Sequence, residues 1–407
     1  MTAVRRHAGP GSRPPGEPWG GDAPQRAPRG GGFVDPERGE ARGDRAASPL
    51  GAGEVSRHDV RLVIVAAGAA GAAGAPEAAS AAGSAPRVEP FAALPRLLRR
   101  GDLVVVNDAA TLPASLPGRT AGGEVFELRL SGPVEGSRLL SVLLGPGDHR
   151  TRTEHRPPPP RIEPGERVTV GGMVAAVASA VGRRVELVVR AEPDALWQAL
   201  YAGGAPVQYA HRSERLALWS VQTAYAGRPW AAEMPSAGRP LTWDIVLGLC
   251  RAGIEIAALT HAAGLSSTGD DALDRALPWP ERYEIPRRTA DAIARARARG
   301  GRVIAVGTSV VRALEAAAAD AAVGPGAAAG EIRPGSGIAA LRLDASYRPR
   351  VVAGLVSGLH VPGESHFELL SALAPVDRLI DALALAARHG MSSHELGDAC
   401  LILPAPA

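Results

Sequence analysis

Polar side chains follow directly on four segments whose length and apolar character are typical of buried strands. They are Asn107, Asp108, Thr260, His261, Gly307, Thr308, Ser309 and His360. In α/β sheets ligands bind beyond the carboxyl ends of the strands, so such groups collect into one site when the strands are neighbours. Any one of them is explained equally well as a cap for the next helix. The four groups together favour a ligand site at a sheet edge.

The segment at residues 302–312 has the form of a strand, a tight turn and a helix. Gly307 allows a close backbone turn, and Thr308 and Ser309 are residue types that cap helices. The N-terminus of such a helix attracts a carboxylate or a phosphate. Neither GxxxxGKS, GxxxxGKT nor GxGxxG occurs, so the sequence supports no nucleoside triphosphate or dinucleotide site.

Residues 360–366 carry two histidines and a carboxylate: His360, Glu364 and His366. Imidazole titrates near neutral pH, so this segment is a candidate for acid–base chemistry. A metal ion is not expected, because no HExxH motif or Cys/His array accompanies the segment. Glu395 and Asp398 are a further candidate carboxylate pair, although solvated carboxylates in turns are commoner.

Asn107 is the only asparagine in the chain, and all 45 basic residues are arginine. A GC-rich genome explains this bias, because lysine and asparagine share A-rich codons. Codon pressure removes dispensable asparagines, so the one that remains is a candidate functional group. Its amide both donates and accepts hydrogen bonds. A structural turn that requires asparagine is an equally good explanation.

The elements that would position these groups are of two kinds. From about residue 116 to 189, short β-like runs alternate with turns rich in Gly, Pro and Asp, which predicts a small barrel or sandwich. Strand-like and helical segments alternate in the rest of the chain, which is typical of an α/β fold. The predicted strands are 61–65, 103–106, 254–259, 302–306, 351–359 and 401–403, and the predicted helices are 90–100, 241–252, 287–299, 310–319, 367–374 and 376–388.

Length and composition bound the function. The 407 residues allow two or three domains, and 45% hydrophobic with 21% charged residues is ordinary globular usage. A net charge of +3 does not by itself indicate a polyanion partner. No segment has the length of a membrane span, and two cysteines give no disulfide framework, which fits a cytoplasmic protein. Residues 1–55 are rich in Gly and Pro and are expected to be disordered.

Seven segments are similar, in order, to the motifs of one known family. Residues 100–108 and 112–116 resemble GDLLVxNDTRVIPARL, and residues 301–315 resemble GRVIAVGTTSVRTLE nearly residue for residue. The others are residues 122–127, 222–226, 235–238, 354–362 and 397–402, which resemble GGKVEVLL, YQTVYA, the start of PTAGLHFT, DGLLTNFHLP and YGDAMLI. From about residue 57 to 403, the chain resembles the S-adenosylmethionine:tRNA ribosyltransferase-isomerases of queuosine biosynthesis.

The resemblance implies a fold and a reaction. The fold would be a discontinuous α/β domain (residues 56–115 and 197–407) with a small β-barrel domain inserted at residues 116–196. Family members move the ribosyl part of S-adenosylmethionine onto 7-aminomethyl-7-deazaguanine in tRNA. They form epoxyqueuosine and release adenine and methionine. S-adenosylmethionine would be the co-substrate and tRNA the partner, with no metal and no membrane, and a monomer is favoured.

The same reaction suggests residue roles. A base must remove a proton beside the sulfonium and an acid must assist departing adenine, and His261 and His360 are the candidates. Asp108 and Asp398 are the candidate catalytic carboxylates. Donors at the start of a helix would hold the methionine carboxylate. The proposed S-adenosylmethionine-binding residues are Asn107, Ser236, Gly238, Gly307, Thr308, Ser309 and Arg312.

The departures from the family motifs include the loss of three histidines and one lysine. Pro240, Ala276 and Trp279 stand where the motifs have histidine, and Gly363 stands in place of lysine. The polar residues that could rebuild the site are Arg239, Glu364, His366 and His394. Two alternatives therefore remain open: a transferase that acts on a small acceptor other than tRNA, and a binding protein without catalysis.

Overall fold

The computed structural model describes residues 56–67, 85–322, 330–393 and 396–405. The expectations for residues 1–55, for His394 and for Glu395 lie outside these ranges. Among the described residues, no helix is long and apolar enough to cross a membrane.

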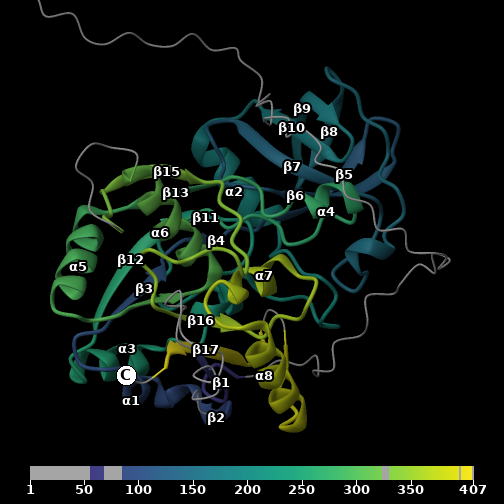
Figure 1. Ribbon diagram of the computed structural model, residues 1–407. Coiled ribbons are helices and arrows are strands. Elements are labelled where there is room, and N and C mark those ends of the chain that lie inside the picture. Colours follow the sequence, from purple (N-terminus) through teal and green to yellow (C-terminus); the bar gives the residue numbers. More distant parts are fainter. Residues whose placement is uncertain (1–55, 68–84, 323–329, 394–395, 406–407) are drawn as a thin grey trace, which may run out of the picture. The chain divides into compact units, whose positions relative to one another are not determined.

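A nine-stranded mixed sheet forms the α/β part of the chain (Figure 1). Its strands, in spatial order, are β15 (Gly335–Ala339), β13 (Glu281–Ile285), β12 (Glu255–His261), β3 (Leu103–Asn107), β14 (Val303–Val306), β16 (Gly354–Gly358), β17 (Ala399–Pro404), β1 (Arg61–Ala67) and β2 (Arg87–Pro90). The four central strands, β12, β3, β14 and β16, are parallel to one another. β17 runs antiparallel to β16 and parallel to β1. The carboxyl ends of four neighbouring strands therefore share one edge of the sheet.

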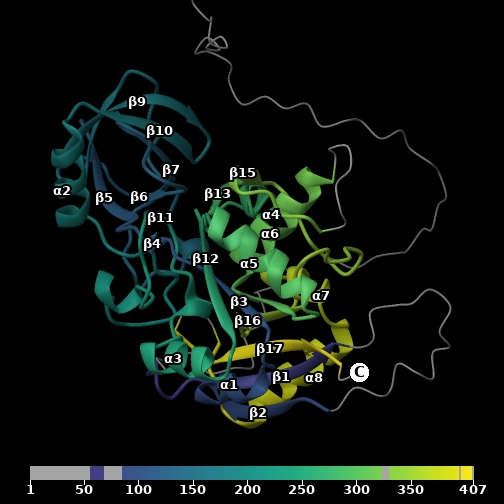
Figure 2. The same ribbon diagram turned by 90° about the vertical axis from the view of Figure 1, so that its left-hand side faces the viewer.

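Helices cover both faces of this sheet because its central strands are apolar on both sides. In β3, Leu103 and Val105 face one apolar core, while Val104 and Val106 face another. The first core contains residues of α5 (Arg287–Ala298), α6 (Thr308–Ala321), α7 (Ser365–Ser371) and α8 (Val376–Arg388). The second contains residues of α1 (Leu94–Leu97) and α3 (Trp243–Arg251), which Figure 2 shows apart from α5 and α6.

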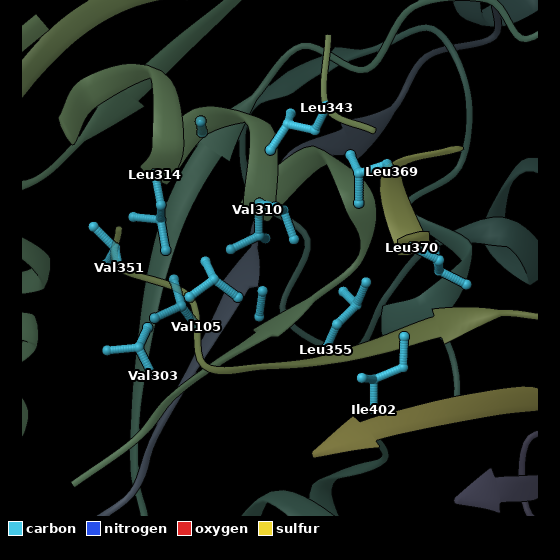
Figure 3. Close-up of a cluster of buried hydrophobic side chains, with 14 of the residues drawn as sticks. Val105, Val303, Val310, Leu314, Leu343, Val351, Leu355, Leu369, Leu370 and Ile402 are labelled. Atoms are coloured by element: carbon cyan, nitrogen blue, oxygen red, sulfur yellow. The ribbon is translucent and has the colours of Figure 1, made fainter. Parts of the chain in front are cut away.

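The first core fixes α6 against the middle of the sheet. Figure 3 shows Val310 and Leu314 of α6 pointing toward Val105 of β3 and Leu355 of β16. All four side chains are fully buried. Burying a Val or Leu side chain contributes roughly 1.5–3 kcal/mol each. This packing holds the start of α6 at the edge where the strands end.

The predicted β unit is a closed six-stranded barrel. Its strands, in spatial order, are β10 (Arg184–Val189), β7 (Arg138–Leu144), β6 (Val125–Leu130), β5 (Ser115–Thr120), β8 (Arg167–Val170) and β9 (Met173–Val181). Closure leaves no free sheet edge. Side chains from the barrel and from α2 (Pro193–Gly203) share one apolar core. The fold class is thus the predicted α/β fold with a barrel, whereas the domain boundaries at residues 116 and 196 stay predictions.

Several predicted elements have different bounds in the structure. The helix expected at residues 90–100 is limited to α1, after a 3-10 turn at Phe91–Ala93. Pro95 fits in the first turn, where proline is tolerated, and the helix ends at Leu97 because Leu98 is extended. Thr260 and His261 belong to β12 instead of following it. Strands β13 and β15 and helix α4 (Asp271–Arg275) were not predicted. The two strands are polar or Gly-rich, so only their neighbours reveal them.

Asp102 joins the starts of β3 and β14. Its carboxylate, 2% exposed, accepts hydrogen bonds from Arg302 Nη2 at 2.6 Å and from the Arg302 amide at 3.0 Å. A third comes from the Arg99 amide at 2.8 Å. Burial acts to raise the pKa of Asp102, but the hydrogen bonds from Arg302 and Arg99 outweigh it and hold this pKa below 3.8.

We predict that Asp102→Asn lowers the free energy of unfolding by about 2 kcal/mol, because it leaves the half-buried Arg302 guanidinium without its counter-charge. The measurement is urea unfolding near neutral pH. Asp344→Asn is the control, since Asp344 is fully exposed and pairs only within its own turn. Equal stability of Asp102→Asn and the wild type would refute this role.

Candidate functional site

The side chain of Asn107 connects three elements at the carboxyl edge of the sheet. Its Oδ1 accepts from the amides of His261 at 2.9 Å and Ala109 at 3.0 Å. Its Nδ2 donates to the carbonyl of His261 at 2.9 Å and to Ser309 Oγ at 3.4 Å. The 2% exposed amide thus ties the end of β3 to β12 and to the first turn of α6. Asn107 is in this structure a positioning residue.

Asp108 lies beside Asn107 and connects the sheet edge to residues 222–226, one of the segments that resemble the family motifs. Thr260 Oγ1 donates to Asp108 Oδ1 at 2.6 Å. Burial, with the negative charge of Asp108, raises the pKa of Tyr225 far above its usual 10. Tyr225 in turn donates to the carbonyl of Gly238 at 3.4 Å. A Cβ at Gly238 would lie only 2.3 Å from this hydroxyl, so the position requires glycine.

The start of α6 lies against the 3-10 turn Ser236–Gly238. Gly307 is the N-cap residue with φ of 93°, a conformation that favours glycine. Thr308 and Ser309 begin the helix itself, so the predicted side-chain cap is wrong. A Cβ at Gly307 would lie 3.8 Å from Ala237 Cβ. The structure therefore brings together two segments that were predicted to bind S-adenosylmethionine, the turn with Ser236 and Gly238 and the start of α6.

His261 lies in a polar cluster with Glu281 and Arg312 inside the fold. Its side chain is 0% exposed, and neither ring nitrogen has a hydrogen-bond partner among the described residues. Nε2 lies 3.4 Å from Oε2 of Glu281. Burial, with the positive charge of Arg312, lowers the pKa of His261 to about 3. The imidazole is therefore neutral at physiological pH.

Arg312 is directed into the fold, and this differs from its predicted contact with a ligand carboxylate. Its guanidinium pairs with Glu281 and donates to the carbonyls of Ala339 at 2.7 Å and Trp279 at 3.0 Å. Burial, with the charge of Arg342, lowers the pKa of Arg312 to about 10. The guanidinium holds β13 and β15 against α6.

His360 and His366 form a stacked pair after β16. Their ring centroids are 4.6 Å apart, with 14° between the planes. His360 Nδ1 lies 3.2 Å from Glu364 Oε2, and 20% of the His360 side chain is exposed. Burial and the neighbouring His360 lower the pKa of His366 to about 3. A carboxylate that orients a partly exposed imidazole is a suitable arrangement for proton transfer.

Asp398 is at the start of β17, on the same sheet edge, but Arg61 occupies its carboxylate. Arg61 Nη2 lies 2.7 Å from Oδ2, and the amides of Arg61 and Ser392 donate at 2.8 and 2.9 Å. The Asp398 side chain is 0% exposed. These contacts join the starts of β1 and β17, which makes Asp398 a structural group in the described arrangement.

Two further features of the site had no role in the sequence prediction. Glu281 also accepts from the Gly264 amide at 2.5 Å and is the link between His261 and Arg312. A cavity of about 340 Å³ extends along β12 and is lined by Tyr225, Val106, Trp243 and Arg288 among others. Glu281 follows two residues after Trp279, one of the positions where the family motifs have histidine, which was the available signal; the cavity had none.

No group of three or more His, Cys, Asp or Glu side chains is placed to hold a metal ion in the ranges that the structure covers. The site offers instead a neutral buried imidazole, a partly exposed imidazole with a carboxylate partner, and the free amides expected at a helix start. These groups are suited to proton transfer and to binding an anion.

We predict that His261 makes the protein sensitive to acid. The pKa of His261 is about 3 when folded against 6.5 for the free side chain. Between these values the unfolded chain binds more protons, so the free energy of unfolding falls as pH falls, by up to about 1.4 kcal/mol per pH unit. His261→Gln removes this contribution and gives a shallower dependence in urea unfolding series from about pH 7 to about pH 5.

The matched control is His155→Gln, because His155 is exposed in the barrel. It should retain the wild-type dependence on pH. The same slope in His261→Gln as in the wild type would contradict the assignment of a buried neutral imidazole.

A family model described as queuosine biosynthesis protein matches residues 56–402. A relative from Synechococcus elongatus, named S-adenosylmethionine:tRNA ribosyltransferase-isomerase, is 35% identical over 77% of this chain and 85% of its own length. A relative of the same name from Gloeobacter violaceus is 33% identical over 79% of this chain and 87% of its own.

A crystal structure of an S-adenosylmethionine tRNA ribosyltransferase from Thermotoga maritima aligns with 85% of this chain and 93% of its own. The TM-score is 0.43 and the identity 19%, so the assignment rests on the sequence matches. By those matches, this chain belongs to the S-adenosylmethionine:tRNA ribosyltransferase-isomerase family of queuosine biosynthesis.

Proposed function

We propose that this protein transfers and isomerises the ribosyl moiety of S-adenosylmethionine onto 7-aminomethyl-7-deazaguanine in tRNA, forming epoxyqueuosine and releasing adenine and methionine. The observation that carries the proposal is the family match over residues 56–402. The polar groups at the carboxyl edge of the sheet support it, because they lie where α/β folds bind ligands.

His360 is the better placed of the two histidines to exchange a proton with substrate. Its side chain retains 20% exposure, whereas His261 has none. The Glu364 carboxylate lies at Nδ1 of His360 and orients the ring, which leaves Nε2 to act on the substrate. In this proposal His360 is the base that removes the proton beside the sulfonium, or the acid that protonates adenine, and Glu364 positions it.

Each remaining predicted residue either contacts S-adenosylmethionine in this proposal or supports the residues that do. The amides of Thr308 and Ser309 would hold the methionine carboxylate, because the first amides of a helix lack partners within it. The Asp108 carboxylate, held by Thr260, would face the sulfonium charge. Ser236 stays a predicted contact.

The supporting residues act in two ways. The backbone around the ligand is shaped by Asn107, Gly238 and Gly307. Arg312, His261 and Asp398 support the site from inside the fold.

The proposal includes a cytoplasmic location, where tRNA is available, and a monomeric state. Cys250 and Cys400 are both unpaired, which accords with a reducing compartment. Size-exclusion chromatography coupled to light scattering checks the monomer.

The test is an incubation of the purified full chain with S-adenosylmethionine and tRNA that carries the aminomethyl-deazaguanine base. We expect adenine, methionine and ribosylated tRNA in equal amounts by mass spectrometry. His360→Gln should lower kcat by about 100-fold or more, in the range of a lost acid–base group. His155→Gln, an exposed barrel histidine, is the control and should match the wild type.

Two outcomes would contradict the proposal. Release of adenine and methionine without ribosylated tRNA would indicate a different acceptor. Binding of S-adenosylmethionine without any turnover would indicate a binding protein. A wild-type kcat in His360→Gln would remove His360 from the mechanism while leaving the function intact.

A further inference from the structure

Two tryptophan rings beside the candidate site have arginine guanidinium groups over their faces. Arg282 lies 4.5 Å and Arg228 5.4 Å from the ring centre of Trp230. Arg184 of the barrel lies 5.0 Å from the ring centre of Trp279. We call these five residues the Trp–Arg surface. Such pairs attract each other because the face of an indole ring is electronegative.

Both tryptophans are connected by backbone contacts to residues of the candidate site. Trp230 is in β11 (Pro229–Ala231), which pairs with β4 (Ala110–Thr111), the strand that follows Asp108. The Gly227 amide donates to the Asp108 carbonyl at 2.7 Å. The Trp279 carbonyl accepts from Arg312 at 3.0 Å, so its position is tied to Glu281 and the buried cluster.

The arginines are held in place while they stay at the surface. Arg228 forms two hydrogen bonds with Glu284, at 2.6 and 2.8 Å, and 47% of its side chain is exposed. Arg282 pairs with Glu135 at 3.5 Å and is 41% exposed. Arg184 is exposed, and both tryptophans are half-buried. Three arginines against two glutamates leave a positive balance, and the ion pairs fix the guanidinium planes of Arg228 and Arg282.

We propose that the Trp–Arg surface stacks the unpaired nucleotides that flank the modified base of tRNA. An enzyme that acts on a base must take it out of its stack, and the neighbouring nucleotides then need new stacking partners. Proteins supply these partners as aromatic rings and as arginine guanidinium planes. The exposed positive charge complements the phosphates. The proposal rests on the proposed function and adds the place where the RNA strand is held.

The test compares Trp230→Leu and Trp279→Leu with the wild type in steady-state kinetics. Leucine retains apolar bulk but removes the stacking face. We expect the KM for tRNA to rise about 5- to 160-fold in each variant, the range that one lost base–aromatic stack gives. The kcat and the KM for S-adenosylmethionine should stay unchanged, because the rings bind tRNA equally before and during the reaction. Trp219→Leu, at the most exposed tryptophan among the described residues (79%), is the control and should match the wild type.

A second readout does not depend on folding of the leucine variants. Titration of unmodified tRNA should quench the tryptophan fluorescence of the wild type, and Trp230→Phe and Trp279→Phe should each lose part of that quenching. Phenylalanine keeps an aromatic ring in place, so these variants retain the packing.

Three results would overturn the inference. One is an unchanged KM for tRNA in both leucine variants. Another is an equal rise in the KM for S-adenosylmethionine, which would make the rings structural parts of its pocket. The third is full quenching in both phenylalanine variants. Failure of the proposed function is separate, because it appears as absent turnover in the wild type, whose tRNA affinity the fluorescence titration still measures.

Discussion

The amide of Asn107 is the interaction on which the geometry of the candidate site depends. It satisfies both backbone groups of His261 and reaches Ser309, so one buried side chain fixes two strand ends and a helix start. Among uncharged side chains, only the amides of asparagine and glutamine carry an acceptor and two donors in one plane. A carboxylate in its place would lack the donor, and an apolar residue would leave buried backbone groups unpaired. This requirement explains why a chain under pressure against asparagine retains one here.

Around this amide, charge and burial are distributed unequally. The cluster of His261, Glu281 and Arg312 lies inside the fold, where the imidazole stays neutral and the ion pair is shielded from water. His360 and Glu364 lie at the surface of the same edge and retain access to a ligand. The buried cluster therefore supports β13 and the segment that carries Trp279, while the accessible pair is suited to chemistry. Burial is therefore what distinguishes the positioning residues of the cluster from the exposed pair, His360 and Glu364.

The elements that the sequence predicted correctly are those whose signal is local. The run Leu103–Asn107 is a strand because its apolar residues are continuous and end at a polar amide. The helix Val376–Arg388 has the predicted bounds because an amphipathic period follows directly after Pro375. The barrel was visible as short apolar runs separated by turn residues. Strand β15 was missed because GSGIA has no strand-like pattern and exists through its pairing with β13. Most of the predicted site residues were selected on a similar local basis, as polar groups at strand ends.

The sequence by itself determined the order of the elements, the polar character of the strand ends and the family, because apolar periodicity, turn glycines and collinear motifs are all written along the chain. Only the tertiary structure decided which polar groups are buried with a partner and which stay exposed. Arg312 is turned inward by Glu281, 31 residues away, and Asp398 by Arg61, 337 residues away. Burial of His261 and stacking of Arg184 on Trp279 likewise arise from segments far apart in sequence. The physical reason is that the partner of a charged side chain and its distance from water are set by packing, which no local pattern encodes.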